Sequence, residues 1–319
     1  MLEVEHLTRR YGPITAVDDI SFQTRSGEIL GFLGPNGAGK TTTMRMITGY
    51  LPPTAGEVRV EGVGLRRDPL AAKRKIGYLP ELPPLYPELT VRDYLLFVSR
   101  LRQVPARDRR SVVERAIERC ALSEVRGRVI GRLSKGYRQR VGIAQAILHN
   151  PRLLIFDEPT AGLDPRQILE TRQLIRGLAG DHTVILSTHI LSEAANTCQR
   201  VIIINRGKLV AVDSPENLTR RVKQTDTLLI ALRGAGLAAQ AAVAQLPGVS
   251  KAELLSEQDG IAKLRVEAKD LASREAIART LVEGGYGLLE LKEVELTLEE
   301  IFLSLTGSGL PAAPAREAL

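Results

Sequence analysis

One short stretch carries glycines, a lysine and a threonine at a spacing that suits phosphate chemistry. It matches the pattern G-x-x-x-x-G-K-[ST] and consists of Gly34, Pro35, Asn36, Gly37, Ala38, Gly39, Lys40 and Thr41. Glycines let backbone N–H groups turn toward phosphate oxygens. We expect the Lys40 ammonium on the β- and γ-phosphates of a nucleoside triphosphate and the Thr41 hydroxyl on Mg²⁺. Thr42, the next residue, belongs to the same predicted nucleotide site.

The elements predicted around this phosphate-binding loop (residues 34–41) are those that the motif requires. Residues 29–33 form an apolar run typical of a buried strand, and residues 42–47 read as a helix that Gly49 ends. A helix N-terminus adds a dipole that favours bound anions. We therefore expect this chain to bind a nucleoside triphosphate.

Two acidic residues follow a second apolar strand. Residues 153–156 are apolar, and Asp157 and Glu158 come directly after them. On a parallel sheet this places Asp157 at the same edge as the phosphate-binding loop, where it would hold Mg²⁺ through water. Glu158 is predicted to be catalytic, because a carboxylate at this position can polarise an attacking water molecule.

A further stretch, Leu133-Ser134-Lys135-Gly136-Tyr137-Arg138-Gln139-Arg140, precedes a helical pattern. Ser134 and Gly136 then lie at a helix N-terminus, which is a second place where phosphate can bind. We call residues 133–140 the signature segment.

Length and composition indicate a globular protein of about two domains. The chain has 319 residues, of which 44% are hydrophobic, and no apolar run approaches the ~20 residues of a membrane span. Its N-terminus lacks the layout of a signal peptide, so we expect a cytoplasmic protein. The two cysteines fit a reducing compartment, and Cys120 lies on the apolar side of a helical pattern. We find no zinc-binding pattern.

The formal net charge of +7 is unevenly distributed. Residues 92–140 hold thirteen arginines and one lysine against five acids. A basic block of this density suits nucleic acid, anionic lipid headgroups or an acidic partner. A solvated helical face with Arg–Glu pairs explains it equally well.

The order of predicted elements indicates an α/β fold with two domains. Short strands at 2–8, 20–24 and 57–60 precede alternating strands and helices, which predict a core with a parallel sheet. An all-helical insertion interrupts this core at about 91–150. We expect the first domain to span 1–221 and a β-α-β-β-α-β domain to span 222–306. A short helix at 298–303 would close the second domain, and residues 307–319 are predicted to be a disordered tail.

Together these motifs resemble the ATP-binding subunits of ABC transporters over roughly residues 1–218. The signature segment is similar to the L-S-G-G-Q-x-Q-R sequence of that family, and residues 161–164 resemble the loop that crosses its dimer interface. His189 occupies the position of the family's switch histidine, which contacts the γ-phosphate. Tyr11 occupies the position of the aromatic residue that stacks on adenine.

The resemblance implies an architecture and partners. It implies an ABC-type P-loop NTPase core with a mixed sheet, followed by a small α+β ferredoxin-like accessory domain like that of single-domain ATPases of type-2 exporters. Two copies would pack head to tail, so that Ser134 and Gly136 of one subunit contact the ATP of the other. A polytopic membrane permease is the expected further partner. The chain would then be peripheral on the inner face of the cell membrane, with no nucleic acid bound.

Three residues depart from the family pattern. Glu81 stands where the family has a glutamine that binds Mg²⁺; the added carboxylate would either bind Mg²⁺ more strongly or compete for the attacking water. Lys135 and Tyr137 replace a glycine and a glutamine of the signature. Lys135 would either add positive charge near the partner's γ-phosphate or point to solvent.

Other functions fit the sequence less well. A soluble ABC ATPase acting on nucleic acid or ribosomes, using the arginine block, is the main alternative to an exporter motor; such relatives usually carry two cassettes or a long coiled-coil insertion. A GTPase switch is disfavoured because no N-K-x-D motif is present. The presence of Glu158 and His189 argues against a purely regulatory ATP-binding module.

Overall fold

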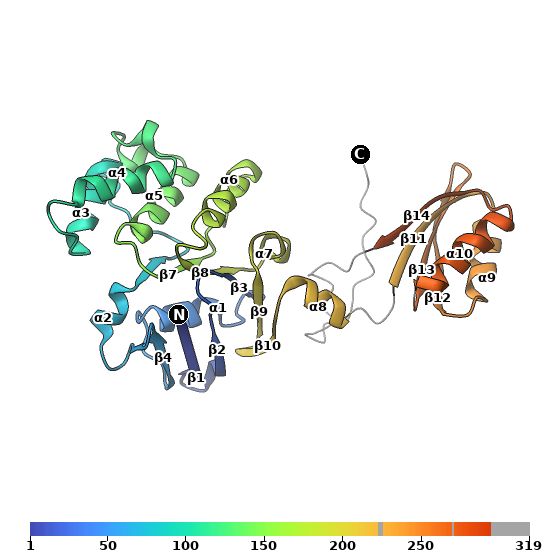
Figure 1. The fold of residues 1–319 in the computed structure, drawn as a ribbon, viewed down its shortest axis with the longest axis horizontal. Helices are drawn as coiled ribbons and strands as arrows, with labels where there is room; N and C mark the ends of the chain where they lie inside the picture. Colours follow the sequence, from blue (N-terminus) through green and yellow to red (C-terminus); the bar gives the residue numbers. More distant parts are fainter. Residues whose placement is uncertain (223–225, 270, 295–319) are drawn as a thin grey trace. The chain divides into compact units, whose positions relative to one another are not determined.

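A computed structural model describes residues 1–222, 226–269 and 271–294 (Figure 1). The chain divides into two compact units, Met1–Pro215 and Glu216–Leu319. Helix α8 (Pro215–Val222) begins at this division, and the boundary expected after residue 221 lies near the end of the same helix. The predicted closing helix at 298–303 and the predicted tail lie outside the described residues.

A six-stranded mixed sheet forms the centre of the first unit. Its strand order is β10-β9-β3-β8-β7-β6, and only β9 and β10 pair antiparallel. The bounds are β3 Ile29–Leu33, β6 Ile76–Leu79, β7 Leu153–Asp157, β8 Thr183–Thr188, β9 Arg200–Asn205 and β10 Lys208–Asp213. Every residue of β3, β7 and β8 is buried, because helices or a second sheet cover both faces of such strands. The carboxyl ends of these three strands therefore meet at one edge.

A second sheet packs against the first through apolar side chains. It has the order β2-β1-β4-β5, with β1 Leu2–Tyr11, β2 Ile14–Gln23, β4 Ala55–Val60 and β5 Val63–Gly64. The second strand begins at Ile14 rather than at the predicted Ile20, because Gly12 at φ +55 makes a tight turn that pairs Tyr11 with Ile14. Phe22 of this sheet and Phe32 of β3 lie in one core cluster, with ring centroids 5.7 Å apart.

The predicted insertion at 91–150 is helical. It contains α3 (Val91–Leu101), α4 (Arg109–Arg119), α5 (Lys135–Ile147) and two short 3₁₀ helices, Ser123–Val125 and Ile130–Arg132. Thr90 caps α3, since its hydroxyl accepts from Asp93 N at 3.2 Å and donates to the Asp93 carboxylate at 2.7 Å. Cys120 is fully buried, as the helical pattern predicted, and burial raises the pKa of its thiol to about 12.

Four more helices cover the first unit. They are α1 (Lys40–Ile47), α2 (Pro69–Arg74), α6 (Pro165–Arg176) and α7 (Leu191–Thr197). The sequence pattern did not predict α2 or α7, because helices of two turns or fewer show little periodicity. No helix within the described residues has the length and apolar character needed to cross a membrane.

The second unit has the element order β-α-β-β-α-β expected from its sequence. The elements are β11 (Asp226–Arg233), α9 (Gly236–Ala244), β12 (Val249–Gln258), β13 (Ile261–Ala268), α10 (Leu271–Glu283) and β14 (Leu288–Val294). The strands form one antiparallel sheet of order β12-β13-β11-β14. Both helices lie on the same face of this sheet (Figure 1). Alternate residues of β11 and β13 are buried beneath them, including Ile230 and Leu264.

We predict that Gly31→Ala destabilises the first unit by about 1–3 kcal/mol, the usual cost of overpacking a core. A Cβ atom at Gly31 would lie 2.9 Å from the Cys198 Sγ and 3.1 Å from a Val201 methyl group. Thermal unfolding followed by circular dichroism should show a lower midpoint. In a Cys198→Ala background the same substitution should cost less, because the sulfur is gone. An equal cost in both backgrounds would show that the sulfur is not the obstacle.

Candidate functional site

The phosphate-binding loop joins the end of β3 to the start of α1. Gly39 has φ +106, and a Cβ atom on it would lie 2.6 Å from the Ala16 carbonyl oxygen, so a side chain there would be both strained and obstructed. Lys40 Nζ donates to the carbonyl oxygens of Gly34 at 2.8 Å and Pro35 at 3.3 Å. The loop therefore curls around a buried ammonium group.

The two acids at the end of β7 are held by the neighbouring strand. Asp157 pairs with Ser187 of β8, and the Ser187 hydroxyl donates to Asp157 Oδ1 at 2.5 Å while accepting from Glu158 N at 3.0 Å. Glu158 has φ +48, a left-handed conformation that costs an L-residue ~1 kcal/mol. In a continuing strand, the side chains of Asp157 and Glu158 would point to opposite faces of the sheet. The left-handed turn at Glu158 ends the strand and breaks this alternation.

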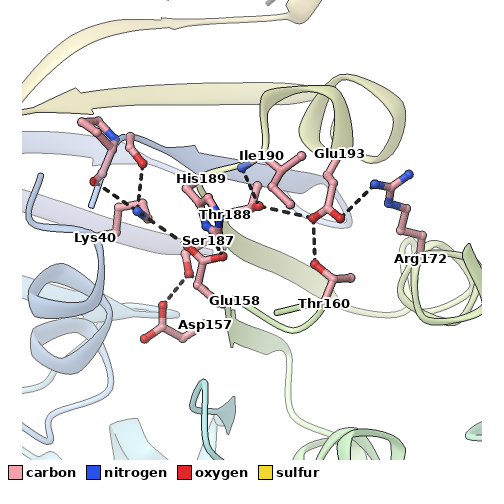
Figure 2. A network of polar contacts seen from close by, with 12 residues as sticks. Lys40, Asp157, Glu158, Thr160, Arg172, Ser187, Thr188, His189, Ile190 and Glu193 are labelled. Carbon is pink, nitrogen blue, oxygen red and sulfur yellow. Dashed lines mark hydrogen bonds and ion pairs between the residues drawn. The ribbon is translucent and has the colours of Figure 1, made fainter. Parts of the chain in front are cut away.

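The Glu158 carboxylate lies between a lysine and a histidine (Figure 2). Its Oε1 is 3.6 Å from Lys40 Nζ, and its Oε2 is 2.9 Å from His189 Nδ1. The side chains of Lys40 and Glu158 are 6% and 10% exposed, whereas that of His189 is 46% exposed. A carboxylate in this position can accept a proton from a water molecule beside it, with the Lys40 ammonium positioned to compensate its charge and His189 Nδ1 within hydrogen-bond distance.

A polar cavity of about 280 Å³ opens at this point. Its lining residues are Ala16, Asn36, Gly37, Gly39, Lys40, Thr41, Thr42, Glu81, Glu158, Ala161 and His189. Most of these residues were predicted from sequence, and they come from separate segments of the chain. The size and lining of the cavity suit the phosphate groups of a nucleotide.

The oxygen donors at this cavity fit Mg²⁺ bound together with a phosphate. Thr41 and Glu81 line the cavity, whereas Asp157 is 1% exposed and is not among its lining residues. In the described part of the chain, no group of three or more His, Cys, Asp or Glu residues is arranged to hold a metal. Mg²⁺ typically uses one or two carboxylates together with water and substrate phosphates, so it does not require such a group.

Six residues predicted to contact nucleotide do not line this cavity: Gly34, Pro35 and Ala38 of the phosphate-binding loop itself, and Tyr11, Ser134 and Gly136. Ser134 and Gly136 line a different cavity, of about 770 Å³, at the N-terminus of α5. Ser134 caps that helix, its hydroxyl accepting from Tyr137 N at 3.4 Å. Tyr11 is 44% exposed, with the Arg9 guanidinium 4.7 Å above its ring. One chain therefore does not gather all the predicted nucleotide contacts in one place.

The two unusual residues of the signature segment contact their own chain. Lys135 is an exposed residue, and its ammonium group lies against Gly162, so close that a Cβ atom on this glycine would collide with it. The Lys135 side chain therefore extends to residues 161–164. We call residues 161–164 the interface loop. The Tyr137 ring lies 5.8 Å from the Arg140 guanidinium.

Sequence reasoning missed two residues that organise the site. Ser187, which bonds both acids of the pair, lies two residues before His189 on the strand next to β7. Its position in that strand was the available signal. Glu193 is a carboxylate on α7 that is only 3% exposed. Glu193 shares the buried side of this short helix with Ala194 and Thr197. A single acid in so short a helix gave no clear signal in the sequence.

Comparisons with known proteins agree with this geometry. Residues 17–161 match the model of a protein family described as ABC transporter. The bacitracin transport ATP-binding protein BcrA of Bacillus licheniformis is 34% identical over 322 residues, covering 97% of this chain and 98% of that protein. The linearmycin resistance ATP-binding protein LnrL of Bacillus subtilis (strain 168) is 32% identical over 316 residues, covering 97% and 99%.

Solved structures of ABC transporter ATP-binding subunits share the fold of about two thirds of this chain. The structure of an ATP-binding subunit of an ABC transporter matches 70% of this chain and 93% of its own, with TM-score 0.63 and 30% identity. A dimeric structure of the ATP-binding cassette MJ0796 in a post-hydrolysis state, bound to ADP and Pi, matches 67% of this chain and 98% of its own, with TM-score 0.61 and 25% sequence identity. The alignments cover nearly the whole of this chain and of these relatives, and the solved structures share its fold. The chain therefore belongs to the ATP-binding subunits of ABC transporters.

Proposed function

We propose that this chain is the ATP-hydrolysing motor of an exporter and that it drives a separate membrane permease. The observation that carries this proposal is the Glu158 carboxylate held between Lys40 and His189 at the wall of the cavity. Relatives named for bacitracin transport and linearmycin resistance support export as the direction. They lend no support to the alternative of an ATPase acting on nucleic acid.

In the proposed reaction, Glu158 takes a proton from a water molecule whose oxygen attacks the γ-phosphorus of ATP. The bond from this phosphorus to the bridging oxygen breaks, and the electron pair leaves with ADP. Lys40 stabilises charge on the phosphate oxygens. A His189 imidazolium carries N–H on both ring nitrogens, so it can donate Nδ1–H to Glu158 and Nε2–H to a phosphate oxygen.

We further propose that Thr41, Asp157 and Glu81 hold Mg²⁺ directly or through water. When bound, this ion neutralises charge on the β- and γ-phosphate oxygens. Glu81 lies at the cavity wall, where its carboxylate adds negative charge that the family's glutamine lacks.

The nucleotide site is proposed to be completed by a second copy of the chain. Ser134 and Gly136 lie at the N-terminus of α5, in a cavity separate from that of Lys40. A head-to-tail dimer would bring this helix N-terminus of one subunit to the γ-phosphate held by the other. Tyr11, at the end of β1, is proposed to stack on the adenine.

The permease is proposed to dock on the proline-rich segment, residues 81–92. This segment runs from Glu81 at the cavity to helix α3 of the insertion. Leu82 is 80% exposed, and Tyr86 is 50% exposed although its ring packs edge-on against Tyr94 and Phe97. Exposed apolar side chains beside the cavity suit a short helix of a membrane protein. The subunit would thus be peripheral on the cytoplasmic face of the membrane.

Replacement of Glu158 tests the hydrolytic role. Glu158→Gln keeps the size of the side chain but removes its basicity, so we expect Mg²⁺-dependent ATP hydrolysis to fall ~10²–10⁴-fold. ATP binding should persist and an ATP-bound dimer should accumulate, both measurable by size-exclusion chromatography with labelled ATP. Glu118→Gln, at an exposed position on α4, is the matched control. Hydrolysis by Glu158→Gln at the parental rate would exclude Glu158 as the base.

A mixture of two inactive variants tests whether the sites are shared between subunits. Lys40→Ala and Ser134→Arg should each abolish hydrolysis, but their heterodimer contains one site with both lesions and one intact site. The mixture should therefore regain measurable hydrolysis and ATP-driven dimerisation. Ser111→Arg, on an exposed turn of α4, controls for added charge. A mixture no better than its parents would argue for sites built within one chain.

Charge placed on the proline-rich segment tests the docking proposal. Leu82→Asp combined with Tyr86→Asp should move the subunit from the membrane fraction to the soluble fraction while leaving ATP binding unchanged. The control pair is Leu70→Asp with Tyr50→Asp, because these side chains are 71% and 77% exposed but lie elsewhere on the unit. If the first pair still sediments with its permease, the docking surface lies elsewhere, and the arginine-rich helical insertion becomes the next candidate.

A further inference from the structure

Glu193 is a buried carboxylate whose two oxygens have different partners (Figure 2). Its Oε2 accepts from the Thr160 hydroxyl at 2.7 Å and from the Thr188 hydroxyl at 3.3 Å. Its Oε1 forms an ion pair with an Arg172 guanidinium nitrogen at 2.9 Å. The side chains of Glu193 and Arg172 are 3% and 18% exposed. Removing a charge from water costs several kcal/mol, so a buried carboxylate needs partners. Within the described residues neither Glu193 Oε1 nor Arg172 Nε makes a hydrogen bond, so the ion pair compensates charge while the two threonine hydroxyls supply the hydrogen bonds.

These partners come from the two segments that flank the proposed base. Thr160 lies two residues after Glu158 and directly before the interface loop. Thr188 is the residue before His189, and its hydroxyl also accepts from Ile190 N at 3.0 Å. The backbone on both sides of the histidine is thus tied to one carboxylate.

The ion pair extends the connection into helix α6. This helix starts directly after the interface loop, where Asp164 caps it by accepting from Gln167 N at 2.9 Å. Arg172 lies further along the same helix. Glu193 therefore contacts Thr160, directly before the interface loop, and Arg172, on the helix that follows this loop.

We propose that Glu193 is a positioning residue that couples His189 to the interface loop. A shift of His189 on contact with a γ-phosphate would be passed through Thr188 and Glu193 to Thr160 and to α6. The interface loop would then report the state of its own ATP site to the second subunit. This last step rests on the head-to-tail dimer proposed above, whereas the coupling within one chain does not.

The coupling within one chain is tested by a substitution whose effect is read at a distance. Thr188→Val removes the hydroxyl on the histidine side and leaves the interface loop untouched. We expect faster hydrogen exchange at residues 160–164 as well as at 188–190. The matched control is Thr197→Val, because Thr197 is a buried threonine of α7 whose hydroxyl has no hydrogen-bond partner within the described residues. If exchange at 160–164 in Thr188→Val equals that in the control, the coupling is refuted.

The functional consequence is read from ATP hydrolysis by the full-length chain. Thr160→Val keeps the buried ion pair, so it should fold. We expect it to slow hydrolysis about tenfold, which corresponds to a barrier about 1.4 kcal/mol higher. The Hill coefficient for ATP should fall toward one, while ATP affinity of the separate subunit stays unchanged. Glu193→Gln should lower the rate and the Hill coefficient at least as far, because it also removes the charge paired with Arg172, and the double variant should be no worse than Glu193→Gln alone.

The outcomes separate this inference from the proposed function. A parental chain without Mg²⁺-dependent hydrolysis would overturn the proposed function, and the hydrogen-exchange result would still decide the coupling. If the parental chain is active and cooperative but Thr160→Val matches Thr197→Val in rate and Hill coefficient, the coupling has no role in communication between sites. Fully additive losses in the double variant would show that Thr160 and Glu193 act separately.

Discussion

A lysine ammonium and a glutamate carboxylate, both almost fully buried, face each other at 3.6 Å, and this pair sets conditions that much of the first unit meets. Each side chain has lost most of its water, so each needs polar partners within the protein. Lys40 finds them in the carbonyl oxygens of Gly34 and Pro35, which requires a loop too tight for side chains at Gly39. Glu158 finds a second basic neighbour in His189. A parallel arrangement of β3, β7 and β8 brings all three segments to one edge.

Further polar contacts, away from the cavity, hold the backbone that carries His189. His189 is 46% exposed, so packing alone does not fix it, and its position depends on the backbone that carries it. That backbone is bonded through Thr188 to the carboxylate of Glu193, which in turn holds Thr160 and Arg172. Within the first unit, polar contacts and the backbone between Thr188 and His189 thus connect the phosphate-binding loop with α6. Such chains of hydrogen bonds are stiff only when every member has a partner, so the loss of one member affects the others.

Sequence alone predicted the parts of the site that are local in the chain. The phosphate-binding loop follows β3, the two acids lie at the end of β7, and His189 follows β8; their place on a parallel sheet follows from topology. The Glu193 contacts were not predictable in this way, because Thr160 is 33 residues distant and nothing in either segment marks the other. Helix α7, which carries Glu193, is too short to show a period. The direction of Lys135 was also undetermined, since a long exposed side chain has no pattern that fixes its orientation.

The separation of the signature segment from the phosphate-binding loop has a mechanistic consequence under the proposed head-to-tail arrangement. Ser134 and Gly136 lie in a cavity distinct from that of Lys40, so a lone subunit binds nucleotide without the second helix N-terminus. Under this proposal, full stabilisation of the γ-phosphate would require a partner, and hydrolysis would be tied to dimerisation. The interface loop lies beside Lys135 of the signature segment and is anchored to Glu193. In the proposed dimer, the surface facing the partner would thus be joined through Thr160 and Glu193 to the backbone that carries His189.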